Sequence, residues 1–192
     1  MRDPWHDDSP RDECGVFALY APEMDVARLT FFALFALQHR GQESAGIAVT
    51  DGAKLIVHKE MGLVSQVFQE ETLQSLPGRL AIGHVRYSTT GSSEMRNAQP
   101  FARTRDGSFI ALAHNGNLVN TDELRASLLQ NGHVFESTSD TEVIAALLAE
   151  HPSRDIRLAL RDVVPRLRGA FSAVLLTRDE VIGFRDPYGI RP

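Results

Sequence analysis

The chain has 192 residues, enough for one domain that buries about 70% of the surface exposed by its unfolded form. A net charge of −5 without any run of lysine or arginine argues against a nucleic-acid-binding surface. The longest apolar stretch, residues 29–37, is far shorter than a membrane span. Cys14 is the only cysteine, which excludes an intramolecular disulfide and an all-cysteine metal site and fits a reducing cytoplasm.

Residues 1–13 differ from the rest of the chain. They carry five acidic residues against two arginines, two prolines that oppose a helix, and no apolar run of the kind found in a secretory signal. We therefore predict a disordered acidic leader or propeptide, followed by a folded part that begins at Cys14.

Apolar patterning predicts the first folded elements. Residues 14–21 are rich in β-branched and aromatic side chains and predict a buried strand. Residues 25–39 predict a helix, because apolar residues recur at three- and four-residue spacing. We assign the aromatic side chains of this helix to the core, with an interaction surface as the alternative. The spaced apolar residues are Val26, Leu29, Phe32, Ala33, Ala36 and Leu37, and the aromatic ones are Phe31, Phe32 and Phe35.

The middle of the chain mixes strands and a helix. Residues 45–50 and 54–59 flank Asp51-Gly52, a dipeptide typical of a hairpin turn. Residues 64–76 predict a helix.

Two further strands are predicted over residues 80–88 and 109–114. The polar stretch between them, residues 89–107, is long for a plain connection, and we predict a functional loop there.

The last third predicts paired helices followed by paired strands. Because strands and helices each come in pairs, we expect an α+β fold with antiparallel sheets and helices outside. The helices span 120–130, 140–150 and 153–168, and the strands 170–177 and 181–185. Predicted caps are Asn120 with Glu123, Ser139 with Glu142, and Ser153.

Cys14 has two interpretations from the residues alone. It is either a small buried hydrophobe at the start of a strand, or a nucleophile preceded by a removable leader.

Polar residues gather at the ends of several predicted elements, where functional sites are usually built. Each has a plain structural alternative: Arg86 and Asp140 as a surface pair, Asp140 as a helix-terminus charge, and Asn115-Gly116 as a turn. The segments are residues 38–46, 84–89, 114–118 and 138–142.

Taken together, these segments resemble one known family. The Cys-Gly start, QHRGQESAGI, GHVRYST, AHNGNL, TSDTE and FRDPYGIRP are similar to the glutaminase domain of the amidophosphoribosyltransferase family, within the class II glutamine amidotransferases. The resemblance covers residues 14–192. It implies the N-terminal nucleophile (Ntn) hydrolase fold, a four-layer αββα sandwich with antiparallel sheets.

The resemblance implies a cysteine nucleophile that hydrolyses glutamine to glutamate and ammonia through a thioester. Cys14 would become the first residue, and its free α-amine would accept the thiol proton. The oxyanion hole would come from the Asn115 side-chain amide and the Gly116 backbone N–H.

Substrate-binding roles also follow from the resemblance. Arg86 would bind the α-carboxylate of glutamine and Asp140 its α-ammonium group. Tyr87 and Thr89 would line the pocket.

The surroundings of the nucleophile follow in the same way. Arg40 and Gly41 would support it by the same match. We interpret His39, His84 and His114 as structural hydrogen-bonding residues, and expect no metal site.

The family's phosphoribosyltransferase domain has no counterpart before Pro192, so we predict a fragment of a larger, cytoplasmic enzyme. The resemblance implies that the full-length protein makes 5-phosphoribosylamine from phosphoribosyl pyrophosphate, in the first committed step of purine synthesis, as a homo-oligomer. Its Mg²⁺, and the iron–sulfur cluster of some members, would bind outside this chain. Two alternatives remain: another class II glutaminase, or a catalytically silent glutamine-binding or regulatory module that retains its leader.

Overall fold

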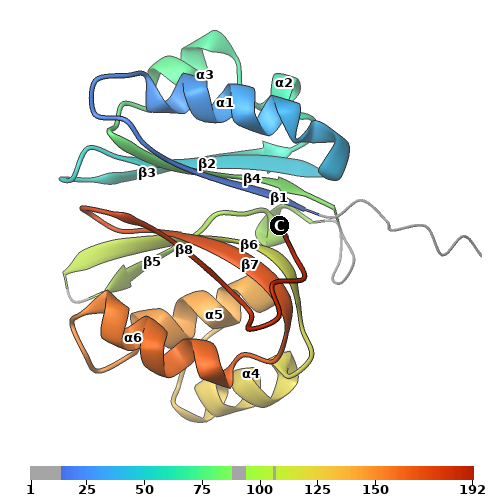
Figure 1. The fold of residues 1–192 in the computed structure, drawn as a ribbon, viewed down its shortest axis with the longest axis vertical. Helices are drawn as coiled ribbons and strands as arrows, with labels where there is room; N and C mark the ends of the chain where they lie inside the picture. The colour runs from blue at the N-terminus through green and yellow to red at the C-terminus, as the bar shows by residue number, and fades with distance from the viewer. Residues whose placement is uncertain (1–13, 88–93, 106) are drawn as a thin grey trace, which may run out of the picture.

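The strand-rich runs of the sequence pair into two four-stranded antiparallel sheets that lie face to face (Figure 1). The computed structural model describes residues 14–87, 94–105 and 107–192. Helices cover both outer faces, three above the first sheet and three below the second (Figure 1). The described part of the chain is therefore an αββα sandwich, as predicted.

The first sheet has the strand order β1-β4-β2-β3. Every residue of its two central strands, β2 and β4, is buried, because helices cover one face and the second sheet covers the other. The strands are β1 (Gly15–Tyr20), β2 (Ser44–Thr50), β3 (Leu55–Met61) and β4 (Leu80–Arg86), and the helices are α1 (Val26–Ala36), α2 (Val64–Val67) and α3 (Glu70–Gln74), with a 3-10 turn η1 (Gln38–Arg40).

The second sheet has the order β5-β6-β7-β8 and is covered by the last three helices. Its strands are β5 (Phe101–Arg105), β6 (Ser108–Leu118), β7 (Gly169–Leu176) and β8 (Val181–Arg185). The helices are α4 (Thr121–Gln130), α5 (Asp140–Ala149) and α6 (Ile156–Val163), with 3-10 turns η2 (Met95–Asn97) and η3 (Val164–Arg166).

Apolar side chains fill three layers. One cluster lies between each sheet and its helices, and a third lies between the two sheets. Half of that third cluster is alanine, so the sheets can approach closely. Its buried members are Ala48, Leu80, Ile82, Ala111, Ala113 and Leu176.

The prediction that the aromatic residues of α1 lie in the core is confirmed for Phe31 and wrong for Phe32 and Phe35. Phe32 and Phe35 are 58% and 55% exposed, and only Phe31 packs against the core. The helix instead turns a smaller face toward the sheet, and the aromatic residues at positions 32 and 35 fall on the opposite side. The buried residues of α1 are Val26, Ala27, Thr30 and Leu34.

The single helix predicted over residues 64–76 is two short helices. The backbone is extended at Phe68 and Gln69, which ends α2 and sends the Phe68 ring into the core beside His58. Burial of this ring outweighs continuation of the helix.

The predicted loop 89–107 contains a strand that the pattern missed. Residues 101–105 form β5, which pairs with the first half of β6. The strand predicted over residues 109–114 runs on to Leu118, because β7 pairs with it as far as that residue. Asn115 and Gly116 therefore lie inside a strand and form no turn.

Two predicted capping boxes are absent. Asn120 precedes α4, but its side chain bonds instead to Arg166 and Arg168 near the start of β7. Ser139 does cap α5, whereas Glu142 is fully buried and accepts from the backbone of Glu136 and Ser137.

Helix α6 begins at Ile156, later than the start predicted at residue 153. Its N-cap is Asp155, whose carboxylate accepts from Arg157 N, and not Ser153. No helix in the described ranges is long and apolar enough to cross a membrane.

Candidate active site

Cys14 lies immediately before β1, at the edge of the first sheet. The Gly15–Val85 pair places it beside the end of β4. Its Sγ accepts from the backbone N–H of Tyr87 and donates to the Tyr87 carbonyl, both at 3.4 Å. The thiol is partly buried, and among the described residues its hydrogen bonds are to the backbone of Tyr87.

Burial raises the pKa of the Cys14 thiol above its ordinary value, although the Tyr87 N–H and the charge of Arg86 act in the opposite direction. In the chain that includes residues 1–13, the nitrogen of Cys14 is part of a peptide bond. An amide nitrogen is no base, so the thiol of this form stays protonated at neutral pH.

Arg40 and Gly41 hold the backbone around Cys14. The Arg40 Nε donates to the Cys14 carbonyl at 3.3 Å. A side chain at position 41 would place its Cβ 2.7 Å from backbone atoms of Val85 and Arg86, so only glycine packs against β4 there. Both residues that the resemblance assigned to supporting roles therefore contact the site.

Arg86 ends β4 with its guanidinium buried, and it is not half of a surface pair. Its Nη1 donates to Glu43 Oε1 at 3.0 Å, and Glu43 is itself only 14% exposed. The other oxygen of Glu43, Oε2, is buried without a hydrogen-bond partner in the described ranges. Glu43 thus fixes the direction of the guanidinium and offsets part of its positive charge.

Asn115 and Gly116 lie side by side on β6. Asn115 is 1% exposed, its Nδ2 donates to the Pro192 carbonyl at 3.3 Å, and its Oδ1 is buried without a partner in the described chain. Gly116 has φ +144°, and a Cβ there would lie 2.2 Å from the Ala170 carbonyl oxygen on β7. The glycine is needed for strand packing as well as for any approach of a substrate.

Asp140 is the first residue of α5, and His114 holds its carboxylate. Oδ2 accepts from Leu118 N at 3.0 Å, and Oδ1 lies 3.5 Å from His114 Nδ1. Burial alone would raise the pKa of Asp140, but His114 and the backbone N–H groups of Leu118 and Thr141 outweigh it and leave the pKa below its ordinary value. Asp140 is therefore a carboxylate at neutral pH.

The three histidines have hydrogen-bonding roles, consistent with their structural interpretation. His39 Nδ1 lies 3.0 Å from the Ala36 carbonyl at the end of α1. His84 is fully buried, its pKa is lowered to about 3 by burial, and its Nε2 lies 3.2 Å from the His114 carbonyl across the two sheets. His114 differs from the others because it also orients Asp140.

The described part of the predicted loop holds β6 and α5 in place. Gln99 bonds to both the N–H and the carbonyl of His114, at 2.7 and 3.2 Å. Asn97 is fully buried and bonds to the Thr138 N–H at 3.0 Å, two residues before Asp140. The polarity of this stretch predicted a functional loop, but no pattern in the sequence singled out Asn97, Gln99 or Glu43.

The structure brings most of the predicted site residues to one end of the sandwich. The charges of Arg86 and Asp140 both act on the Cys14 thiol, and the His84–His114 contact joins the strands that carry them. Tyr87, 41% exposed, borders the site through its backbone, while Thr89 lies outside the described residues. Among the described residues, no group of three or more histidine, cysteine or acidic side chains is arranged to hold a metal ion.

A buried guanidinium, a buried carboxylate and a partly buried thiol at a strand edge are the kinds of group that bind and attack a small charged substrate. A family model for the glutamine amidotransferase domain matches residues 84–192, and the chain belongs to this family. The two stacked antiparallel sheets with outer helices are the Ntn hydrolase fold.

The relatives of this chain carry a more specific name than the family model does. The chain is 56% identical to the amidophosphoribosyltransferase of Synechococcus elongatus over 188 residues and 50% identical to that of Mycobacterium tuberculosis over 192 residues. The solved glutamine phosphoribosylpyrophosphate amidotransferase from B. subtilis, complexed with ADP and GMP, matches with a TM-score of 0.85 and 40% identity over 92% of this chain and 38% of that one.

The shared region is the amidotransferase part of these proteins. Each curated match covers 96% of this chain, but only 38% of the Synechococcus protein and 36% of the mycobacterial one.

Proposed function

We propose that residues 14–192 supply ammonia by hydrolysing glutamine within an amidophosphoribosyltransferase. One observation carries the proposal: the Cys14 thiol is hydrogen-bonded at the edge of the first sheet to the backbone of Tyr87, the residue that follows the buried Arg86. The names of the relatives support an amidophosphoribosyltransferase, in which a separate phosphoribosyltransferase domain would convert phosphoribosyl pyrophosphate to 5-phosphoribosylamine. A cytoplasmic location and a homo-oligomeric state are further parts of this proposal, carried over from the resemblance.

Removal of residues 1–13 would create the base that the reaction needs. The new α-amine of Cys14 has an ordinary pKa of about 7.7–8.0, so its neutral form can accept the thiol proton. The Cys14 thiolate then attacks the side-chain amide carbon of glutamine. The C–N bond breaks, ammonia leaves with the proton from the amine, and water hydrolyses the thioester to glutamate and free thiol.

Two residues on β6 would stabilise the oxyanion. Asn115 offers an amide hydrogen and Gly116 a backbone N–H, and loss of one such donor lowers turnover by about 10²–10³. The buried Oδ1 of Asn115 accepts no hydrogen bond in the described chain, so the orientation of this amide rests on its Nδ2.

The two ends of free glutamine have different partners. The Arg86 fork, held by Glu43, would bind the α-carboxylate, and Asp140, held by His114, would bind the α-ammonium group. Tyr87 and Thr89 would border this pocket, and Arg40 and Gly41 would hold the backbone of Cys14. Mg²⁺ and an iron–sulfur cluster would belong to other parts of a full-length enzyme, and the hydrolysis of glutamine would use neither.

The test replaces Cys14 with alanine in the processed protein. We expect Cys14→Ala to lose glutamine hydrolysis and to keep its circular dichroism spectrum and melting temperature. Release of glutamate and ammonia is the measurement, and persistent release would mean another nucleophile.

Intact-mass analysis separates the enzyme from a silent glutamine-binding module. A protein that has lost residues 1–13 and takes up one equivalent of a diazo-ketone analogue of glutamine at Cys14 supports the proposal. A purified full-length protein that retains the leader, or that reacts equally well with and without it, contradicts the role of the α-amine.

A further inference from the structure

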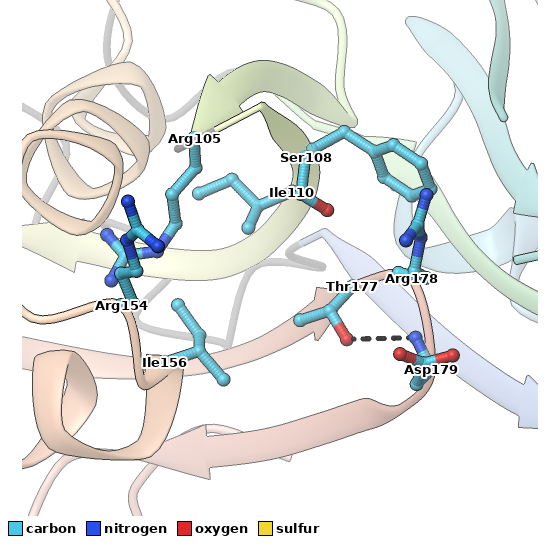
Figure 2. Close-up of a pocket in the computed structure, with 9 residues that line it drawn as sticks. Arg105, Ser108, Ile110, Arg154, Ile156, Thr177, Arg178 and Asp179 are labelled. Carbon is cyan, nitrogen blue, oxygen red and sulfur yellow. Dashed lines mark hydrogen bonds between the residues drawn. The ribbon is translucent and has the colours of Figure 1, made fainter. Parts of the chain in front are cut away.

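A cavity of about 260 Å³ lies at the end of the second sheet that carries the β5–β6 turn (Figure 2). Its walls come from the β5–β6 hairpin, the start of α6 and the turn between β7 and β8. Ser108, on its rim, is seven residues along β6 from Asn115, a separation of about 23 Å in an extended strand. The cavity is therefore separate from the candidate active site.

Three arginines line this cavity: Arg105, Arg154 and Arg178. Asp179 is the only carboxylate among the lining residues that the structure describes, and it accepts from Arg79 at 3.0 Å. Neither Arg154 nor Arg178 forms an ion pair with any described residue. The cavity thus has an excess of positive charge, in a chain whose net charge is −5.

Arg105 is a fixed part of the wall. It is 6% exposed, and its guanidinium donates to the carbonyl of Leu148 in the last turn of α5 and to that of Ser153 in the connection between α5 and α6. Figure 2 shows Arg105 and Arg154 on one side of the cavity and Arg178 and Asp179 on the other. Positive charges that line one cavity repel one another, and a bound anion reduces that repulsion.

We propose that this cavity binds a phosphate group, either free phosphate or the phosphate of a small monoester. Guanidinium groups recognise phosphate oxygens through paired N–H donors, and neither Arg154 nor Arg178 bonds to another residue in the described part of the chain. The hydroxyl of Ser108 on the same rim adds a neutral donor, whereas the Thr177 hydroxyl already donates to the Glu180 carbonyl at 3.3 Å. The fixed charge of Arg105 contributes a field that a mobile surface arginine does not provide.

The test is a calorimetric titration of the full chain with inorganic phosphate, and separately with glycerol phosphate, at constant ionic strength. Arg154→Gln and Arg178→Gln remove one exposed guanidinium each, so neither threatens the core. We expect each variant to weaken binding about tenfold. The control is Arg161→Gln, which removes the same charge from α6 outside the cavity, where Arg161 pairs with Asp162.

Saturable binding of either ligand supports the site. The ligand that binds more tightly shows whether the site prefers free phosphate or a phosphate monoester. The proposal is overturned if neither ligand shows saturable binding up to about 10 mM. A Kd at this limit corresponds to a binding free energy of about −3 kcal/mol, so the range includes weak sites. Equal weakening in Arg161→Gln also overturns it, because the attraction would then be a property of net charge alone.

Discussion

Arg86 and Asp140 each reach the site with a partner that fixes their direction. Glu43 holds the guanidinium and His114 holds the carboxylate, so neither group depends on substrate for its position. Preorganised groups of this kind lose little conformational entropy when a ligand binds. Substrate affinity is therefore expected to depend on the partners as well as on the two groups themselves.

Arg86→Lys tests the carboxylate site. Lysine keeps the charge but replaces a two-pronged planar donor, so we expect the KM for glutamine to rise about tenfold or more, with a smaller change in kcat. Steady-state glutamate release measures both constants. Arg79→Lys, on the far side of the fold, is the control, and an unchanged KM in Arg86→Lys would remove this residue from the carboxylate site.

His114→Ala tests whether the imidazole positions Asp140. Loss of the ring frees the Asp140 carboxylate to rotate, and we expect a higher KM for glutamine with kcat less affected. His114→Asn can return an N–H near the position of Nδ1 and should recover part of the affinity. A role confined to folding would lower the melting temperature of both variants and leave the KM of the folded fraction unchanged.

At the scale of elements, β6 is the strand on which the site depends most. It carries Asn115 and Gly116, and β7 pairs with it throughout this region. The dipeptide alone also fits a turn, and only the pairing partner resolves the ambiguity. A local sequence pattern does not indicate that residues 169–176 will pair with β6.

Gly116→Ala tests the strand packing. The new Cβ would lie 2.2 Å from the Ala170 carbonyl oxygen at a φ of +144°, so we expect a loss of more than about 3 kcal/mol of unfolding free energy, or failure to fold. Gly132→Ala is the matched control: φ is +88° there, but nothing lies within 4 Å of the new Cβ. Its expected loss is about 1–2 kcal/mol, measured by urea unfolding. Equal losses in the two variants would show that backbone conformation, and not contact with β7, determines the effect.

At the scale of the whole molecule, apolar contacts hold the two sheets together, and buried carboxylates order the second half. Glu142 joins β5 to α5 through Arg103, and Asp186 accepts from Phe171 N at 2.9 Å and orders the turn after β8. Burial alone would raise the pKa of Glu142 and of Asp186, but hydrogen bonds from backbone N–H groups outweigh it and leave both values lowered. Asp140 behaves in the same way.

These carboxylates predict loss of stability in acid. Because their pKa values are lower in the folded state, their contribution is complete above the unfolded values of about 4–4.5 and is lost as the pH falls through the folded values. We expect the unfolding free energy from urea titrations to start falling below about pH 6.5, because buried His84, with its pKa lowered to about 3, is protonated there only in the unfolded chain. The fall should become steeper below about pH 4.5, where the carboxylates add to it. Glu142→Gln should lower stability at neutral pH and flatten the acid slope, and a free energy that stays constant to about pH 3.5 would contradict this assignment.

The sequence by itself determined the nature of the fold and most of the chemical groups. Alternating and helical periodicity predicted most strands and helices, since these patterns depend on neighbours along the chain. The segments that resemble the family named Cys14, Arg86, Asn115, Gly116 and Asp140, and the structure gathers them at one end of the sandwich.

Only the tertiary structure decided which partners these residues have. Glu43 beside Arg86, His114 beside Asp140, and the choice of the small face of α1 over its phenylalanines depend on contacts between segments far apart in the chain. Such contacts arise when two sheets and two helical layers pack together, and no local pattern encodes the distance between them. The same packing creates the arginine-lined cavity at the far end of the sheet, from residues that share no motif.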